Sequence, residues 1–364
     1  MLKDKFLAAG RDALKPASKH TNSLLPSFSL PSKQKIQTRD LFEAACPSAS
    51  AEELAEFKTF RSQRDMIRNC NSSVLSEISK NNFDRSDCGE FHEENFNYMQ
   101  DRELTVFPLT KNFIELKGHD ITSRMRYAII NWLVDVHKSF QLTPESLFLT
   151  VAVMDRYIHR TSIKIKKESI QLLALTALYV SAKFEEIFPP EISEIAGLCE
   201  DNITKEHIKE AEKDILKTLN FTLSFPSPIV FLRRLTSALG SDHGAHSLAK
   251  YLLELSIAEY DLAHLTGNKR ASIAVCLAQA LSTQCGDLSK IWVDGMVYLT
   301  GLKLEDIVDD LRVLARAVYR QNSPSRYRAI KNKYTDTESL GRVAELPILR
   351  SVLLENIGGI EFDN

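Results

Sequence analysis

The chain has no large excess of charge of either sign: its 364 residues include 46 Lys and Arg against 48 Asp and Glu. A general nucleic-acid binder usually carries a marked basic excess, so this balance argues against that class. Long apolar runs are also missing, since an uncharged stretch such as 169–182 is shorter than the ~17–25 residues of a membrane-spanning helix. We therefore expect neither direct binding to nucleic acid nor a membrane span.

Paired cysteines are missing too. The six cysteines lie far apart without any C-x-x-C pair, and the first residues contain no uninterrupted apolar segment of the signal-peptide type. This usage predicts a reduced, intracellular protein without a structural zinc site.

The motifs of common enzymes are not found. The sequence contains no G-x-G-x-x-G, no Walker loop and no G-x-S-x-G, and Phe96 stands where an H-E-x-x-H motif starting at His92 needs its second histidine. The nine histidines are scattered, as is typical of surface or capping residues. We expect no catalytic centre, no metal and no cofactor.

What is present is apolar material for packed cores, at 44% hydrophobic residues. Residues 1–35 are the exception, because they are rich in Ser and Pro, lack Tyr and Trp, and carry seven Lys or Arg against two Asp. Such a segment cannot bury enough apolar area to offset its conformational entropy. We predict a largely disordered tail over 1–90, although residues 36–90 are ambiguous.

From residue 91 to 319 the apolar spacing is helical. After an entry helix over 93–106, it predicts two sets of five helices: 122–140, 143–158, 167–186, 191–199 and 204–219, then 228–239, 245–264, 269–284, 288–299 and 304–319. Two similar sets of about one hundred residues indicate a structural duplication. The predicted domains are 1–90 as the tail, 91–225 as the entry helix and first set, and 226–364 as the second set with a C-terminal extension.

The third helix of the first set is apolar on every face over 172–180, and 271–281 has nearly the same character. A helix without a polar face has no side for solvent, so each should be the centre of its set. The predicted fold class is therefore all-α, with two successive five-helix bundles after the tail.

The predicted helix 122–140 has an apolar arc too wide for one core contact. At ~100° per residue, the helix has three sides. The first apolar side carries Met125, Ile129, Trp132 and Val136, with Ala128 beside them. The second carries Ile130, Leu133, Val134 and His137, and the remaining, more polar side carries Asn131, Asp135 and Lys138. Either both apolar sides are buried, or the first is a surface patch that binds an apolar peptide. Periodicity alone leaves both alternatives open.

Arg126 falls on the core side of the same helix, where an isolated charge would be unfavourable. Asp155, in the otherwise apolar second helix, is the nearest plausible partner. We interpret Arg126 and Asp155 as a structural ion pair.

The end of the apolar third helix breaks a local rule. Lys183 suits the negative end of the helix dipole, but Glu185 and Glu186 oppose it. Such departures tend to occur at functional sites, so this end favours an interaction surface over a merely solvated helix end.

Several long motifs resemble the cyclin family. They are MRYAIINWLVDV at 125–136, MDRY at 154–157 and SAKFEEIFPPE at 181–191, followed by FLRR at 231–234, AKYL at 249–252 and EYD at 259–261. KNKY at 331–334 and the later Leu346-Pro347 resemble the B type rather than the A type. The resemblance covers residues 91–354 and implies two cyclin-box folds.

The resemblance also implies a function and a partner. A cyclin is the activating subunit of a cyclin-dependent serine/threonine protein kinase, here one that controls mitotic entry and progression, and it contributes no catalytic group. On this reading Lys183 and Glu212 grip the movable C-helix of the kinase in a heterodimer. The matching kinase-binding residues are Lys183, Phe184, Glu185, Glu212, Leu216 and Phe221.

A second implied surface docks substrates that carry Arg-x-Leu motifs. Its matching residues are Met125, Ala128, Ile129, Trp132, Asp135 and Gln171. Ala128 stands where the family commonly has Ile, and Asp135 replaces a longer Glu that would meet the arginine of the motif. Both departures predict a weaker docking surface.

Mitotic cyclins carry an Arg-x-x-Leu degron in the N-terminal tail, which a ubiquitin ligase recognises, and Arg11 to Leu14 fit that pattern. The resemblance implies a protein of the nucleus and cytoplasm. The alternative is a cyclin-fold transcription or nucleic-acid adaptor, which would need a basic face and usually an N-terminal zinc ribbon. Neither is visible in the sequence.

Overall fold

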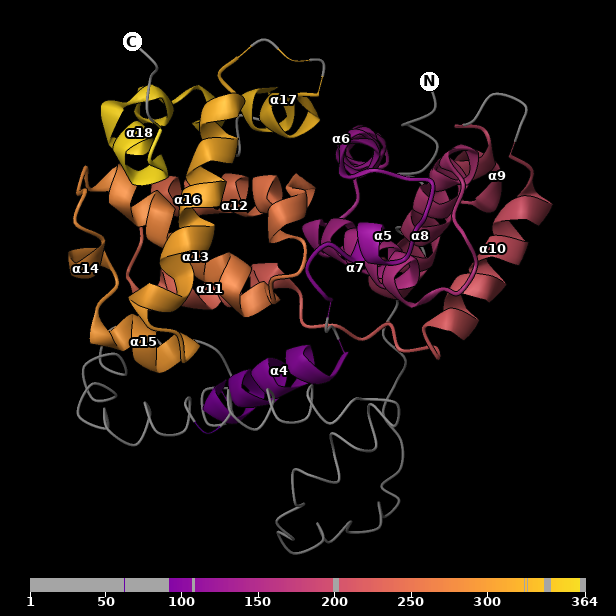
Figure 1. The fold of residues 1–364 in the computed structure, drawn as a ribbon, viewed down its shortest axis with the longest axis horizontal. Helices are drawn as coiled ribbons and strands as arrows, with labels where there is room; N and C mark the ends of the chain where they lie inside the picture. Colours follow the sequence, from indigo (N-terminus) through magenta and orange to yellow (C-terminus); the bar gives the residue numbers. More distant parts are fainter. Residues whose placement is uncertain are drawn as a thin grey trace, which may run out of the picture. The chain divides into compact units, whose positions relative to one another are not determined.

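The structure, a computed structural model, describes residues 62, 92–106, 109–198, 203–323, 325, 327–336 and 342–360. Within these ranges all regular structure is helical and no strand occurs, so the predicted all-α class is confirmed (Figure 1). The predicted tail, apart from residue 62, and the degron from Arg11 to Leu14 lie outside the described residues.

The first helical set has the five predicted helices. They are α6 (Ser123–Ser139), α7 (Pro144–Arg160), α8 (Ile170–Glu185), α9 (Ile192–Ala196) and α10 (Lys205–Thr218). The apolar α8 is the centre of the set, as its lack of a polar face predicts: it packs against α6, α7 and α10, and its residues from Leu173 to Leu178 are buried. A single turn of 3-10 helix (Lys167–Ser169) precedes it.

The second set repeats this plan around a buried α13. Its helices are α11 (Pro228–Ala238), α12 (His243–Ala258), α13 (Gly267–Ser282), α15 (Asp294–Thr300) and α16 (Leu304–Arg320), with the short α14 (Leu288–Ile291) between α13 and α15. The side chain of Thr266 caps α13 by accepting from the backbone N–H of Lys269. Helix α13 packs against α11, α12 and α16.

Two predicted helix bounds in the second set are wrong. The helix predicted over 245–264 ends at Ala258, and a 3-10 turn (Tyr260–Leu262) follows. The helix predicted over 288–299 is interrupted between α14 and α15, where the backbone of Trp292 leaves the helical region with a ψ of 72°. The buried indole of Trp292 donates to the carbonyl of Leu302 at 2.9 Å, a tertiary contact that local periodicity does not reveal.

Side chains of the entry helix α4 (His92–Val106) contact the second set, although the predicted domains group this helix with the first. Phe96 lies edge-on against Phe231, with ring centroids 5.3 Å apart. Gln100 donates to the carbonyl of Thr300 at 3.1 Å. At the far end of α4 the buried carboxylate of Glu103 accepts from the backbone N–H of Asn268 and so caps α13.

The ion pair of Arg126 and Asp155 lies inside the molecule and joins the two sets. Its two hydrogen bonds measure 2.8 and 2.7 Å, and both side chains are almost completely buried. The guanidinium also donates to the carbonyls of Ile257 and Ala258, at the end of α12. Arg126 therefore links α6 and α7 of the first set to α12 of the second.

The C-terminal extension forms helices that the sequence analysis did not predict. They are α17 (Ala329–Asp336), 3-10 turns at Val343–Glu345 and Pro347–Arg350, and α18 (Val352–Gly358). Helix α17 packs against α6 and α12 (Figure 1), and α18 packs against α16. As a result the third side of α6 is not solvated at Asn131, which is buried and donates to the carbonyl of Tyr127.

Candidate protein-binding surfaces

The residues assigned to kinase binding lie together where α8 ends beside α10. Lys183 in the last turn of α8 forms an ion pair with Glu212 of α10, and its ammonium lies 4.3 Å from the ring centroid of Tyr179, one turn earlier. Both side chains remain accessible to solvent. The two charges are therefore already aligned with each other, although 29 residues separate them.

Large apolar side chains stand exposed at and just after the ends of α8 and α10. The exposed fractions are 50% for Phe184, 87% for Ile187, 90% for Phe188 and 70% for Phe221. Leu216 is half-buried. Exposed large apolar side chains on packed neighbouring helices are typical of a protein-binding surface. Ile187 and Phe188 are not among the predicted site residues, because periodicity says nothing about side chains that follow the end of a helix.

The backbone at Phe221 is strained. Asn220 and Phe221 both have positive φ, 49° and 56°, and the N–H of Phe221 donates to the carbonyl of Leu216 at 2.8 Å. Asn adopts this left-handed region readily, but a bulky aromatic residue there is an outlier. Local strain of this sort concentrates at functional positions. Here it holds an aromatic ring in solvent beside the end of α10.

Glu186 is one of the two carboxylates that oppose the dipole of α8. It has a structural role at the start of the preceding helix, α7. Its Oε1 accepts from the N–H and hydroxyl of Thr143 and from the hydroxyl of Ser146, at the start of α7. Partial burial alone would raise the pKa of Glu186, but these hydrogen bonds outweigh it and lower that pKa. These contacts give Glu186 a structural role of its own, because a carboxylate interacts favourably with the positive end of α7.

Glu185 has no such compensation. Partial burial, followed by the repulsion of Glu145 and Glu186, raises its pKa. Its side chain is exposed at the last residue of α8, next to Phe184 in the sequence. An uncompensated carboxylate at this position is available to a cation on a partner.

The base of this surface is fixed by a contact between α7 and α10. The hydroxyl of Tyr157 donates to the carboxylate of Asp214. Burial, and then the contact with Asp214, raises the pKa of Tyr157 to about 12. Asp214 lies two residues from Glu212, so this hydrogen bond also fixes the position of the Glu212 region of α10 relative to α7.

The predicted substrate-docking residues form a strip along α6. Thr122 caps this helix by accepting from the N–H of Met125. Each apolar member of the strip is partly exposed; these members are Met125, Ala128, Ile129 and Trp132. Met125, Ile129 and Trp132 also pack against the core. Val136, which completes the apolar side in projection, is buried instead.

The polar members lie at the edges of the strip. Asp135 is exposed, and partial burial of its carboxyl raises its pKa despite the nearby Lys138. Gln171 is exposed in the first turn of α8, the helix that packs beside α6. The strip is therefore continuous on one helix, with a polar residue on the neighbouring one.

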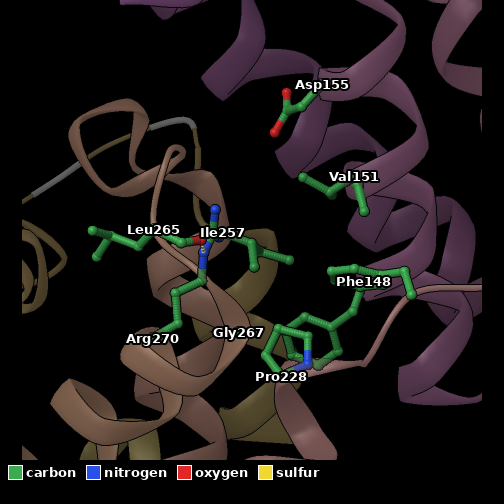
Figure 2. A pocket seen from close by; sticks show the side chains of 10 residues that line it. Phe148, Val151, Asp155, Pro228, Ile257, Leu265, Gly267 and Arg270 are labelled. Atoms are coloured by element: carbon green, nitrogen blue, oxygen red, sulfur yellow. Dashed lines mark hydrogen bonds between the residues drawn. The ribbon is translucent and has the colours of Figure 1, made fainter. Parts of the chain in front are cut away.

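A small cavity lies between the two sets (Figure 2). Asp155 of α7 faces it from one side and Arg270 of α13 from the other, with Phe148 and Val151 among the apolar residues that line it. It has room for about one water molecule, too little for a substrate or an organic cofactor. Among the described residues no cluster of three His, Cys, Asp or Glu side chains could hold a metal ion, and no helix is long and apolar enough to cross a bilayer.

Two family models match the helical region. The cyclin N-terminal domain covers residues 94–224 and the cyclin C-terminal domain covers residues 226–349. The chain belongs to the cyclin family. Its tandem bundles are thus two cyclin domains, as the sequence motifs predicted.

The relatives assign this cyclin to the B type. It is 35% identical over 271 residues to G2/mitotic-specific cyclin-B2 of Bos taurus, covering 74% of this chain and 65% of that protein. It is 32% identical over 268 residues to G2/mitotic-specific cyclin-B of Spisula solidissima, covering 74% and 60%. The chain therefore spans about two-thirds or slightly less of the length of these relatives.

A solved structure supports the fold independently of sequence. The X-ray structure of a viral cyclin from herpesvirus saimiri superposes with a TM-score of 0.50 at 18% identity, covering 70% of this chain and 99% of that one. At this identity the likeness concerns the fold alone.

Proposed function

We propose that this cyclin is the regulatory subunit of a cyclin-dependent serine/threonine protein kinase that acts in mitosis. The names of its relatives, which describe them as G2/mitotic-specific, support the mitotic assignment. In this proposal the cyclin binds and activates the kinase as a heterodimer and supplies no catalytic group.

The observation that carries the proposal is the surface between α8 and α10. Lys183 of α8 and Glu212 of α10 form an ion pair there, and exposed apolar side chains stand at and just after the ends of these two helices: Phe184, Ile187, Phe188 and Phe221. Apolar area would supply most of the affinity, since burial is worth roughly 25 cal/mol per Å². The ion pair would fix the orientation by hydrogen bonding to the backbone or side chains of a partner helix.

Activation would follow from a shift of populations. A protein kinase is active only when its C-helix lies inward, so that the glutamate of that helix pairs with the lysine of strand β3. A partner that binds only this state favours it by its difference in affinity for the two states. The α8–α10 surface needs no chemistry of its own for that purpose.

Further parts of the proposal concern substrates and turnover. The partly exposed strip of α6, from Met125 to Asp135, would recruit proteins that carry Arg-x-Leu motifs. Arg11 and Leu14 would serve as a degron for a ubiquitin ligase. We also propose a distribution between nucleus and cytoplasm.

The test is reconstitution with purified components. The chain is added to a panel of isolated, inactive cyclin-dependent kinases, and phosphorylation of a serine/threonine peptide is measured against cyclin concentration. The proposal predicts saturable activation of at least one kinase. Failure with every kinase, together with capture of the chain by immobilised DNA or RNA, would instead favour the adaptor function.

A further inference from the structure

Helix α6 is buried on two sides, and the second of these is covered by the C-terminal extension. Tyr127 and Asn131 lie about 200° and 240° from Met125 at ~100° per residue, so they lie on a different side of the helix from Met125, Ile129 and Trp132. Asn131 is buried although its side chain is polar, because α17 packs over this side. The docking strip is thus one side of a helix that α17 covers on another side, at Tyr127 and Asn131.

Two contacts hold the extension against the Tyr127 side of α6, and a third joins parts of the extension to each other. The rings of Tyr127 and Tyr327 meet edge to face with centroids 5.8 Å apart. The amide of Gln321 donates to the hydroxyl of Tyr127 at 2.9 Å. The ammonium of Lys331, in α17, donates to the carbonyl of Gln321 at 2.8 Å and so joins the start of the extension to its helix.

On its other side α17 is anchored to the second cyclin domain through Glu254 of α12. This carboxylate is buried and accepts from the hydroxyl of Tyr334 at 2.8 Å and from the ammonium of Lys333 at 2.8 and 2.9 Å. The ring of Tyr334 is fully buried against Tyr251. A buried carboxylate that keeps all these partners permits one geometry only, since losing one would leave its charge poorly compensated.

The geometry points to residues 327–336 as a positioning element for substrate docking. The element connects α12 of the second domain to the side of α6 that carries Tyr127 and Asn131, and so fixes the orientation of the strip formed by Met125, Ile129 and Trp132. This role rests on the docking part of the proposed function. The kinase-binding residues Lys183 and Glu212 lie on α8 and α10, whereas α17 packs against α6, α12 and the turn at Val343–Glu345.

The experiment uses mild variants of the full chain in complex with its kinase. Tyr127→Phe with Tyr327→Ala loosens α17 from α6, and Tyr334→Phe removes one hydrogen bond to Glu254 without removing the ring. The matched control is Trp292→Phe, which also removes a buried donor in the second domain but touches neither α6 nor α17. Trp132→Ala marks complete loss of docking.

Two readouts separate positioning from general stability. For a peptide with an Arg-x-Leu motif, the KM should rise roughly two- to thirtyfold in the α17 variants, with kcat unchanged. The KM for the same peptide without the motif should stay constant. Backbone amide exchange over residues 127–134 should become faster in the α17 variants and remain unchanged in the control.

Each contrary outcome is decisive. If wild type prefers the motif and Trp132→Ala abolishes that preference, a wild-type KM in the α17 variants overturns the proposal. Unchanged amide exchange in α6 also overturns it, whatever the kinase assay gives. If wild type activates the kinase but shows no preference for the motif, docking and its positioning element both fail while the activation proposal stands. No activation by wild type contradicts the proposed function itself, and the positioning role falls with it.

Discussion

The guanidinium of Arg126 binds the carboxylate of Asp155 through two hydrogen bonds of 2.8 and 2.7 Å, and it also reaches two carbonyls of the second domain. A buried ion pair is not in itself strong evidence of stability, because desolvation offsets the attraction. Here, however, the guanidinium of Arg126 donates hydrogen bonds to the last carbonyls of α12 as well as to the carboxylate of Asp155. Its removal should therefore affect both domains.

We predict that Arg126→Ala destabilises the whole helical region, not only the first domain. It leaves Asp155 buried and unpaired, which costs ~3–5 kcal/mol, a large share of the ~5–15 kcal/mol that stabilises a typical domain. Urea denaturation followed by circular dichroism measures the change. A midpoint equal to that of wild type would mean that the pair contributes little.

The burial of Glu103, at the start of α13, should make the free energy of unfolding depend on pH. Burial raises the pKa of Glu103 to about 8, against the opposing hydrogen bonds from Asn268 and Gly267. Because the folded-state pKa lies above the unfolded one, the contribution is fully present below pH ~4.5 and is lost as the pH rises through 8. Relative to Glu103→Gln, wild type should lose ~1 kcal/mol or more between pH 5 and pH 8. Parallel stability curves for the two proteins would contradict this prediction.

Glu185 and Glu186 are neighbours with opposite expected effects. Glu186→Ala removes the cap of α7 and should lower stability by ~1–2 kcal/mol at neutral pH. Since the pKa of Glu186 is lowered, this contribution should disappear as the pH falls below the usual carboxyl range. Glu185→Ala is the matched control: it relieves repulsion and should leave the melting temperature unchanged or slightly higher, while weakening kinase binding. Equal melting temperatures for the two variants would contradict the capping role of Glu186.

Trp132→Ala should separate docking from activation. The indole is partly exposed on the docking strip and packs against the core with its other edge, so the fold should survive its truncation. Aromatic anchors contribute ~2 kcal/mol or more to binding, which corresponds to roughly thirtyfold in affinity for Arg-x-Leu substrates. The specificity constants of matched peptides with and without the motif provide the comparison. An equal loss in specificity constant on both peptides would show that Trp132 is structural. No loss on either peptide would show that the strip does not bind the motif, because Ala128 and Asp135 already weaken it.

Most of the fold could be predicted because its signals are local. The apolar character of 172–180 identified α8 as a centre, and the spacing of apolar residues gave five helices in each set. The break at Trp292 and the entire helix α17 could not be predicted in this way. The first depends on a hydrogen bond to Leu302, and the second on a buried carboxylate, Glu254, about 80 residues earlier.

The same distinction between local signals and contacts distant in sequence applies to the candidate site. Family motifs named Lys183 and Glu212, but only the folded chain shows that they pair with each other. The contacts of Glu186 could not be predicted because its partners, Thr143 and Ser146, begin a different helix. Local rules describe a helix end in isolation, whereas this end is shared by two helices.

The central claim is that the surface between α8 and α10 activates a kinase. It is tested most directly by the double variant Lys183→Ala with Glu212→Ala, compared with Asp120→Ala with Lys164→Ala. The second pair, Lys164 with Asp120, is an exposed ion pair of 2.8 Å that lies outside α8 and α10.

The measurement is the affinity of each variant for the kinase, taken from the cyclin concentration that gives half-maximal activation. Truncating one charged partner at a desolvated contact costs ~2–5 kcal/mol, so the first variant, which truncates two, should lose affinity by at least tens to thousands of fold and keep its helical circular dichroism. The second should match wild type. Wild-type activation by the variant that lacks Lys183 and Glu212 would contradict the account.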